Sequence, residues 1–254
     1  MEFKDKVVII TGSGRGIGQA IALKFARQQA NVVVADRNEP RARETAELVE
    51  KAGGKALAID TDVTHFDSVQ EMQARTLETF GTVNILVNNA GWDVVQPFFE
   101  NTLEMIDKLI DVNLKGCIYC SRVVGEYMMK EQQGKIVNIS SEAGRRGSGT
   151  EAIYAAAKGG VIAFTKSLAT ILGPYNINVN SVSPAITETP AVKKGMEMSK
   201  TIAEAMKLRA EQSLFKRVAQ PDEIADAVLF FSSEASKYVT GQVLSVNGGS
   251  AMQD

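Results

Sequence analysis

The chain has 254 residues, of which 44% are hydrophobic and 23% are charged, and its formal net charge is −2. These values are typical of a globular α/β domain with enough apolar residues for a core. No run of like charges appears, so the composition gives no reason to expect nucleic acid or a membrane surface as a partner. The polar first residues and the short apolar runs predict a soluble, cytoplasmic protein without a signal peptide or a membrane-spanning segment.

Short apolar runs alternate with amphipathic stretches along the whole chain. The apolar runs predict strands at Val7–Ile10, Val32–Ala35, Ala56–Ile59, Ile85–Val87, Ile136–Ile139, Val179–Val182 and Val243–Val246. The stretches between them predict helices at Ile17–Ala30, Pro40–Ala52, Phe66–Phe80, Leu103–Lys130, Glu151–Leu172 and Pro221–Ser232. Strands too apolar to alternate are typical of a parallel sheet that is covered on both faces. We therefore predict a single α/β domain over residues 1–254, built on a doubly wound parallel sheet.

A glycine-rich turn, Thr11–Gly18, separates the first predicted strand from the first predicted helix. Glycines at positions 12, 16 and 18 permit a tight turn and let a pyrophosphate approach the N–H groups of the helix N-terminus, where the helix dipole favours negative charge. The spacing is Gly-x-x-x-Gly-x-Gly and does not fit the familiar G-x-G-x-x-G. Its position between the first strand and the first helix predicts a dinucleotide-binding turn.

Acidic residues at the ends of the next two predicted strands bear on the choice of cofactor. Asp36 ends the second strand, where a carboxylate can hydrogen-bond the adenosine ribose hydroxyls and repel a 2′-phosphate. Arg15 and Arg37 favour the opposite choice, because an arginine can pair with a 2′-phosphate. Since Asp36 would occupy the place that the phosphate needs, we predict NAD, with NADP as the less favoured cofactor. Asp62 and Val63 follow the third strand and are suited to holding the adenine amino group.

Three polar side chains surround the loop after the fifth predicted strand. Tyr154 and Lys158 are four residues apart and share one face of a helix. Ser141 lies at the end of the strand, where the loop can fold it toward the same place. A nearby ammonium favours the phenolate, so Lys158 is expected to lower the pKa of Tyr154 toward a range useful for acid–base chemistry. The alternative is a buried tyrosine and a solvated lysine, because this spacing is common on helices.

Cysteine and histidine residues give no prediction of a metal site. Cys117 and Cys120 lie in an apolar, helix-like run, and we interpret them as two small packing residues on one helix face. His65 is the one histidine of the chain, so a four-ligand zinc site of cysteine and histidine cannot be assembled.

Five motifs resemble the short-chain dehydrogenase/reductase family in their order and spacing, over essentially the whole chain. They are Thr11–Gly18, Asn88–Gly91, Asn113, Ser141 and Tyr154-x-x-x-Lys158. The resemblance implies a Rossmann-like sheet of about seven parallel strands in the order 3-2-1-4-5-6-7, with helices on both faces. It also implies nicotinamide-dependent hydride transfer and a homotetramer.

The resemblance assigns a role to each candidate catalytic residue, namely Asn113, Ser141, Tyr154 and Lys158. Tyr154 would be the acid–base group on the substrate oxygen, Lys158 would lower its pKa and bind the nicotinamide ribose, and Ser141 would orient the carbonyl or hydroxyl. Asn113 would lie where its helix is kinked and help to hold a water for proton relay. Asn89, Ala90 and Gly91 would close the cofactor site beside the fourth strand.

The later part of the chain resembles the nicotinamide and substrate region of the family. Residues 184–189 lie where the family has Pro-Gly and a threonine that contacts the nicotinamide amide, but Ala185 replaces the glycine and puts the local backbone angles in question. The following lysine-rich stretch implies a mobile substrate lid at about residues 187–215, and Gly241–Gly249 looks like the last strand and turn, involved in subunit packing. The candidate cofactor-binding residues are Gly12, Arg15, Gly16, Ile17, Gly18, Asp36, Arg37, Asp62, Val63, Asn89, Ala90, Gly91, Tyr154, Lys158, Pro184, Ile186 and Thr189.

The segments Asn88–Phe98 and Glu151–Gly160 resemble family members that act on 2-hydroxycyclohexanecarboxyl-CoA. This implies oxidation of a cyclic β-hydroxyacyl-CoA. Residue chemistry agrees, since Trp92 could supply an apolar wall for a ring and Arg145 and Arg146 could meet the phosphates of CoA. The alternative for the two arginines is that they are solvated surface cations. A reductase of acyl-carrier-protein thioesters, or a sugar, polyol or steroid dehydrogenase, remains an alternative of the same chemistry. A third hypothesis, from another class, is an NAD-binding scaffold without turnover.

Overall fold

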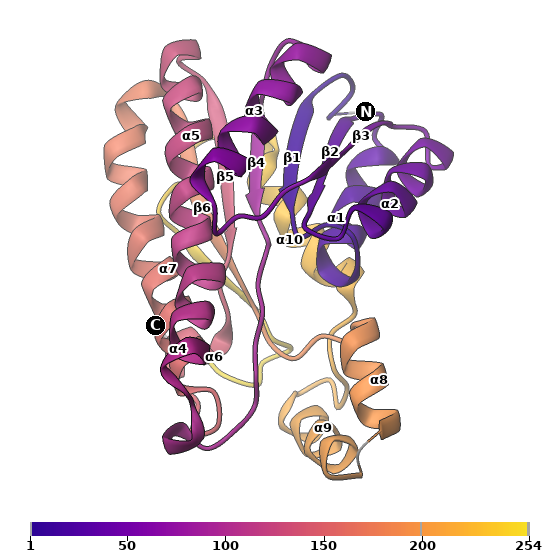
Figure 1. Cartoon of the computed structure of the whole chain (residues 1–254), viewed down its shortest axis with the longest axis vertical. Helices are drawn as coiled ribbons and strands as arrows, with labels where there is room; N and C mark the ends of the chain where they lie inside the picture. The colour runs from indigo at the N-terminus through magenta and orange to yellow at the C-terminus, as the bar shows by residue number, and fades with distance from the viewer. Residues whose placement is uncertain (1, 199, 253–254) are drawn as a thin grey trace.

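The seven apolar runs pair side by side in the structure, a computed structural model that describes residues 2–198 and 200–252. They form one parallel sheet in the order β3-β2-β1-β4-β5-β6-β7, which confirms the predicted Rossmann-like topology (Figure 1). The strands are β1 (Val7–Thr11), β2 (Asn31–Asp36), β3 (Lys55–Asp60), β4 (Ile85–Asn88), β5 (Gly134–Ile139), β6 (Ile177–Pro184) and β7 (Val243–Val246).

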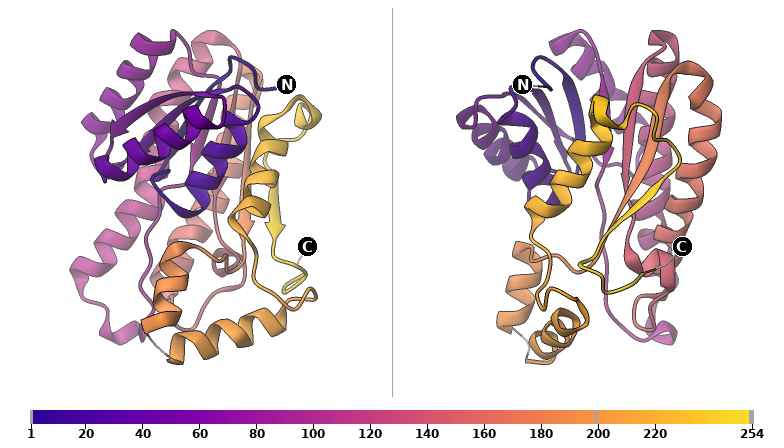
Figure 2. Two further views of the ribbon diagram at one scale, coloured as in Figure 1. Left: turned by 90° about the vertical axis from the view of Figure 1, so that its right-hand side faces the viewer. Right: turned by 180° about the vertical axis from the view of Figure 1, so that it is seen from behind.

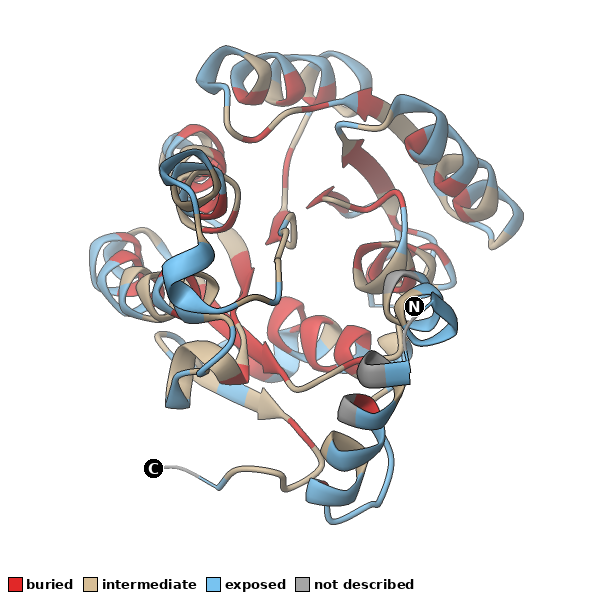
Figure 3. Ribbon diagram, turned by 60° about the horizontal axis from the view of Figure 1, so that its bottom comes forward, coloured by how far each residue is buried: buried red, intermediate tan, exposed pale blue. Residues whose placement is uncertain are grey.

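Helices cover both faces of this sheet, because consecutive side chains of a strand point to opposite faces. On one face, Val8 and Ile10 are buried in a core shared with α1 (Gly16–Ala26), α2 (Glu39–Lys51) and α10 (Pro221–Ser232). On the other face, Val7 and Ile9 are buried in a core shared with α3 (Phe66–Phe80), α5 (Gly116–Glu131) and α7 (Ala152–Leu172). Burial on both faces explains why the strands read as continuous apolar runs, and Figure 3 shows the buried residues on the strands and on the inner sides of the helices.

The predicted helix Leu103–Lys130 is interrupted in the middle. α4 (Leu103–Ile110) passes into a π-helical turn at Asp111–Lys115, and α5 begins at Gly116. Asn113 lies in this turn and is buried. A π-turn widens the helix and redirects its side chains, and such turns are frequent at functional sites. The kink that the family resemblance implied is therefore present.

Two other elements differ from the sequence prediction. α1 ends at Ala26 instead of Ala30, because β2 pairs with β1 from Asn31 onward and the residues between them form a turn, with Gln29 at a φ of 63°. A short helix, α6 (Glu142–Arg146), replaces the start of the predicted loop. The Ser141 hydroxyl caps it by accepting a hydrogen bond of 3.1 Å from the backbone N–H of Ala143.

The lysine-rich stretch forms two helices, α8 (Pro190–Met198) and α9 (Lys200–Gln212). Figures 1 and 2 show this pair, which we call the arm, at the same end of the molecule as α4 and α6, apart from the two helical layers. A parallel bridge between Thr187 and Ala219 joins the start and the end of the arm. The arm therefore leaves and returns at one place, beyond the carboxyl end of β6.

One segment of the described chain, Ala152–Tyr175, is long and apolar enough to cross a membrane when judged by length and composition. It consists of α7 and a short 3₁₀ turn at Gly173–Tyr175. In the structure α7 packs against β6 and β5, and 44% of its apolar stretch is buried. It lies in the protein as a core helix and carries both Tyr154 and Lys158.

Candidate active site

The glycine turn after β1 lies directly against the loop after β4. Gly12 has a φ of 63°, and a Cβ at this position would lie 2.7 Å from the Cα of Ala90. The side-chain amide of Asn89 joins the two loops by donating hydrogen bonds of 2.9 Å to the carbonyls of Thr11 and Gly12. The backbone N–H groups of Asn89 and Ala90 both donate to the Thr11 hydroxyl. These residues meet at the carboxyl ends of β1 and β4, which is the topological switch point where such sheets bind ligands.

We expect Gly12→Ala to destabilise the protein more than Gly81→Ala does. Both glycines have positive φ, but a methyl group added at Gly81, at the end of α3, would have no other atom within 4 Å. The strained backbone alone costs about 1–2 kcal/mol at either site, and the clash with Ala90 adds roughly 1–3 kcal/mol at Gly12. Urea denaturation of both variants measures the difference. Equal losses in the free energy of unfolding would show that the two loops do not need their close approach.

Asp36 fixes the glycine turn from the end of β2. Its Oδ2 accepts a hydrogen bond of 2.9 Å from the Gly14 N–H, and its Oδ1 accepts one of 2.9 Å from the Asn38 N–H. Each carboxylate oxygen can accept a further hydrogen bond, and the residue is only partly buried, so ribose hydroxyls can still reach it. A Cβ at Gly14 would lie 2.9 Å from Asp36 Oδ2. Gly14 was not among the predicted residues, because it lies outside the three spaced glycines.

The remaining candidates for the adenosine side surround this carboxylate. Arg15 and Arg37 are exposed, and the main chain of Arg15 begins α1. Asp62 lies after β3; burial raises the pKa of its carboxyl, but hydrogen bonds from Thr64 and the charges of His65 and Arg37 outweigh burial and lower it. Asp62 is therefore ionised at neutral pH and able to accept from an amino group.

Close packing places Val63 and three further residues of the glycine turn. Val63 is buried against Gly116, where a Cβ would lie 2.6 Å from its side chain. A Cβ at Gly18 would lie 2.5 Å from the Asn89 amide, so this glycine too permits the approach of the β4 loop. Gly16 has a φ of 60°, and a Cβ there would meet Thr189 at 3.5 Å. Ile17 follows in the first turn of α1 and packs against the core.

Asn113 ties the π-turn to the loop after β4. Its Nδ2 donates to the carbonyl of Trp92 at 2.6 Å and to the carbonyl of Leu109 at 2.9 Å, and its Oδ1 accepts from the Trp92 N–H at 3.2 Å. A Cβ at Gly91 would lie 3.0 Å from Asn113 Oδ1 and 3.5 Å from Lys158 Nζ. The side chain of Asn113 thus positions the Gly91–Trp92 segment beside Lys158.

Tyr154, Lys158 and Ser141 come together as the helical spacing predicted. Lys158 Nζ lies 5.7 Å from the centre of the Tyr154 ring and donates a hydrogen bond of 2.8 Å to the carbonyl of Ile139. Burial lowers the pKa of Lys158 to about 8, against the charges of Cys117 and Asp93, which raise it. Burial raises the pKa of the Tyr154 phenol, and the Ser141 hydroxyl interacts with this phenol and lowers its pKa by a smaller amount. A hydroxyl, a phenol and an ammonium therefore surround one small space.

The pKa of Tyr154 is raised, whereas the proximity of Lys158 predicted that it would be lowered. Burial of the phenol is the largest cause, a hydrogen bond with Ser141 opposes it, and the charges of Asp93 and Glu151 raise the pKa further. The prediction was made from Lys158 alone, although two carboxyl groups also lie near the phenol. Both neighbours could have been noticed in the sequence, since Asp93 follows Gly91 and Glu151 precedes Tyr154 by only a few residues.

Asp93 and Glu151 form a carboxyl pair beside the phenol. Burial raises the pKa of Asp93 to about 7, with a hydrogen bond and the charge of Glu151 acting in the same direction and Lys158 opposing them. Glu151 Oε2 accepts a hydrogen bond of 2.7 Å from the Ser148 hydroxyl and lies 3.8 Å from Arg209 Nη2. The raised pKa of Asp93 reflects burial and also the neighbouring Glu151, because a second carboxyl group nearby disfavours the charged form of Asp93.

The segment after β6 approaches the glycine turn from the other side. Pro184 ends β6, and the carbonyl of Ile186 accepts a hydrogen bond of 3.1 Å from the Ala219 N–H. The hydroxyl of Thr189 accepts from the Val192 N–H, and its methyl faces Gly16. Ala185 is not among the described residues with positive φ. Its backbone is therefore suited to alanine, and the replaced glycine leaves no strain.

The three candidate substrate residues do not lie together. Arg145 Nη1 donates a hydrogen bond of 3.2 Å to the Val243 carbonyl of β7, whereas Arg146 lines a cavity together with Arg209 and Gln212 of α9. Successive residues of a helix point about 100° apart, which explains why two adjacent arginines separate. The Trp92 ring packs under Lys108 Nζ at 4.7 Å.

Cys117 and Cys120 are both free and buried, which confirms their interpretation as packing residues. Burial raises the pKa of the Cys117 thiol to about 12 and that of Cys120 also well above its ordinary value. Neither thiol is a reactive thiolate at neutral pH.

Comparisons with known proteins agree with the fold. A family model described as "Enoyl-(Acyl carrier protein) reductase" matches residues 12–251. A 3-oxoacyl-(acyl-carrier-protein) reductase of Thermotoga maritima is 36% identical over 98% of this chain and 99% of its own length. The hydroxy(phenyl)methylsuccinyl-CoA dehydrogenase subunit BbsD of Thauera aromatica is 36% identical over 99% of both chains. The crystal structure of a 3-oxoacyl-(acyl-carrier protein) reductase from Brucella melitensis with bound NAD superposes with a TM-score of 0.88 at 34% identity, covering 99% of this chain and 93% of that one.

Proposed function

This chain belongs to the short-chain dehydrogenase/reductase family, and we propose that it is an NAD-dependent dehydrogenase of a cyclic β-hydroxyacyl-CoA. The family makes it an oxidoreductase with a nicotinamide cofactor. The observation that carries the proposed reaction is the grouping of Ser141, Tyr154 and Lys158 at the carboxyl end of β5, next to β4 in the sheet. A hydroxyl and a phenol there can hold one substrate oxygen while a cofactor lies along the glycine turn.

Each residue of the group has a step that its surroundings favour. A nicotinamide bound along the glycine turn would supply hydride transfer to or from the carbinol carbon of the substrate. Tyr154 accepts the proton of the substrate hydroxyl during oxidation and gives it back during reduction. The Ser141 hydroxyl orients that oxygen, and the positive charge of Lys158 stabilises the phenolate as it forms. Asn113 holds the Gly91–Trp92 segment in place and, by family analogy, helps to order a water for proton relay.

NAD is favoured over NADP by the position of Asp36. Its carboxylate lies at the end of β2 and holds the Gly14 N–H, where an adenosine ribose would lie in this fold. A 2′-phosphate there would meet a negative charge. Arg15 and Arg37 are exposed. Either side chain could therefore reach a phosphate, but exposure does not fix either of them at the place where a 2′-phosphate would lie.

The proposed substrate rests on similarity and on the chemistry of the site. The sequence of the β4 loop and of the start of α7 resembles enzymes of 2-hydroxycyclohexanecarboxyl-CoA, and BbsD, by its name, acts on a CoA thioester that carries a ring. Trp92 offers an apolar surface to a ring. We propose α8 and α9, at about residues 187–215, as the lid over this substrate within a single domain of residues 1–254.

The second candidate is a 3-oxoacyl-(acyl-carrier-protein) reductase. The reductase of Thermotoga maritima supports it, because that protein is as similar to this chain as BbsD is. The two candidates share the reaction and differ in the carrier of the acyl group and in the usual direction. We also propose a cytoplasmic homotetramer, as the family resemblance implies; the exposed apolar side chains Ile118, Ile171 and Leu244 are suited to contacts between copies.

Initial rates against a small panel test the proposed function. The panel contains cyclic and linear β-hydroxyacyl-CoA thioesters, a 3-oxoacyl thioester of acyl carrier protein, and simple sugars, polyols and steroids, each with NAD and with NADP. We expect the highest kcat/KM with NAD and a cyclic CoA thioester. Turnover of the carrier-protein thioester alone would establish the second candidate. Tight NAD binding without turnover of any compound would indicate a scaffold.

We expect Asp93→Asn to extend activity toward lower pH. Above its pKa of about 7, Asp93 is negative, and its charge and that of Glu151 raise the pKa of Tyr154. Two cations oppose these carboxylates: Lys158 acts on Asp93, and Arg209 lies near Glu151. Removing the charge lowers the pKa of Tyr154, so the acidic limb of the kcat/KM profile for oxidation should move down by about one pH unit. The exposed Asp67→Asn is the matched control. An unchanged limb would mean that Asp93 does not act on the phenol.

A further inference from the structure

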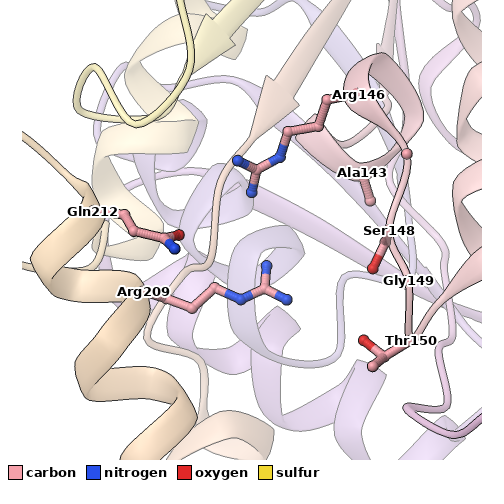
Figure 4. Close-up of a pocket in the computed structure, with 8 residues that line it drawn as sticks. Ala143, Arg146, Ser148, Gly149, Thr150, Arg209 and Gln212 are labelled. Carbon is pink, nitrogen blue, oxygen red and sulfur yellow. The ribbon is translucent and has the colours of Figure 1, made fainter.

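A cavity of about 350 Å³ lies between the loop before α7 and the arm helix α9. From the loop side it is lined by α6 and the residues after it, and from the arm side by two residues of α9. The lining residues are Ala143, Arg146, Gly147, Ser148, Gly149, Thr150, Arg209 and Gln212. Figure 4 shows the side chains of Arg146 and Arg209 extending from opposite walls into the same space.

The polar groups of this cavity are mostly hydrogen-bond donors. Within the described part of the chain, Arg146 has neither a hydrogen bond nor an ion pair. Among the described residues, the ion-pair partner of Arg209 is Glu151, at 3.8 Å, which is a loose contact for a guanidinium. The hydroxyl of Thr150 and the amide of Gln212 add neutral donors (Figure 4).

Two guanidinium groups that face one cavity repel each other unless a negative charge lies between them. Glu151 supplies part of that charge, but it also accepts from Ser148 and is paired with Asp93. Its side chain is 16% exposed and lies at the edge of the cavity nearest Tyr154. One carboxylate that is already shared leaves the two arginines with unused donors.

The cavity is continuous with the catalytic group along the chain. Thr150 lines it and also lines a small adjoining hollow together with Glu151 and Tyr154. The hollow is too narrow for a ligand, so a substrate held at Tyr154 has to reach the two arginines through the open cavity that Thr150 also lines. The wall formed by α9 belongs to the arm that we propose as the substrate lid.

We propose that the cavity between Arg146 and Arg209 binds an oxyanion group of the substrate, a phosphate or a carboxylate, and that Arg209 exchanges its contact with Glu151 for this anion. The inference rests on the proposed function, because it takes the bound molecule to be the alcohol oxidised at Tyr154. Arg209 then has a specificity role, although it lies in the lid and outside the catalytic motifs of the sequence. Arg146 is also separated in function from Arg145, which is held at β7.

Steady-state kinetics with three thioesters of cyclic β-hydroxy acids test the proposal. The first is the CoA thioester, and the second is the N-acetylcysteamine thioester of the same acid, which has no phosphate. The third is an N-acetylcysteamine thioester whose acyl group also carries a free carboxylate. Arg146→Gln and Arg209→Gln are compared with wild type, and Arg75→Gln, an exposed arginine of α3, is the control.

We expect each cavity variant to raise KM by about tenfold or more for the thioester whose own anionic group binds in the cavity, and to change kcat much less. A loss confined to the CoA thioester identifies a phosphate of CoA as the anion, and a loss confined to the third compound identifies a carboxylate. KM for the neutral N-acetylcysteamine thioester should stay unchanged. An equal rise in KM for all three compounds, or none, would overturn the proposal.

Calorimetric titration separates failure of this inference from failure of the proposed function. In the presence of NAD, coenzyme A and succinate are titrated into wild type, Arg146→Gln and Arg209→Gln. If no thioester is turned over but either anion binds wild type and not the variants, the cavity stands as an anion site while the proposed activity falls. If turnover is found, but neither the KM values nor the binding of coenzyme A and succinate depend on the two arginines, the activity stands and the anion site is rejected.

Discussion

Replacing Tyr154 by phenylalanine should reduce kcat by about 10²–10⁴-fold, because general acid–base groups contribute a factor of this size. The substitution removes only the phenol oxygen, which lies beside Ser141 and near the buried Lys158. The aromatic ring keeps its packing, so NAD binding and the free energy of unfolding should change little. Initial rates under saturating NAD and substrate measure the loss, and fluorescence titration measures the binding of NAD.

Tyr127→Phe is the matched control for this prediction. Tyr127 is a half-buried phenol of α5 that donates to the Thr82 hydroxyl at 3.4 Å, away from the cofactor loops. Its loss should leave kcat within about twofold, as is usual for a residue without contact to the reacting groups. A Tyr154→Phe enzyme that keeps most of its kcat would show that another group transfers the proton.

Asp36→Asn should change the preference for NAD over NADP by about 10²-fold, as the ratio of the two kcat/KM values. Loss of a charged acceptor for the ribose hydroxyls weakens the binding of NAD by about tenfold. The charge of Asp36 no longer repels a 2′-phosphate in this variant, and Arg15 and Arg37 lie nearby, so the binding of NADP is strengthened by a similar factor. The amide oxygen can still accept one of the two backbone hydrogen bonds that Asp36 accepts from Gly14 and Asn38, so the turn should stay folded.

A neighbouring carboxylate provides the comparison for the cofactor prediction. Asp60 ends β3, pairs in register with Asp36 and is exposed. Asp60→Asn removes the same charge one strand away and should leave the preference nearly unchanged. If Asp60→Asn changes it as much as Asp36→Asn does, the effect comes from the overall field at this edge of the sheet and not from a contact with the ribose.

Much of the fold could be predicted from the sequence because the sheet is buried on both faces. Val7–Ile10 and the six other apolar runs have the composition of interior strands of such a sheet, and each strand is found. The break at Asp111–Lys115 has no signal in composition or periodicity, and only the resemblance to a family indicated it. α6 has five residues and depends on the Ser141 cap, so it is too short to show a helical period.

The candidate site could be predicted where its residues lie close together on one helix. It was harder to predict where residues far apart in the sequence are brought together by the tertiary fold. Tyr154 and Lys158 share a helix face and therefore met as predicted. The pKa of Tyr154 shifted the opposite way, chiefly because the tertiary fold buries the phenol, and the spacing of Tyr154 and Lys158 does not show that burial. Arg209 is separated from Glu151 by more than fifty residues of sequence, and only the folded arm brings it to the catalytic loop.

Transfer of a deuterium label tests the central claim most directly. The cyclic β-hydroxyacyl-CoA is labelled with deuterium on its carbinol carbon and incubated with NAD and the protein, and the nicotinamide product is analysed by mass spectrometry and NMR. If this chain performs hydride transfer between that carbon and the cofactor, the deuterium appears on the nicotinamide ring and on one of its faces only. Deuterium that is released to the solvent, or that stays in the unreacted thioester while NAD remains bound, would contradict the account.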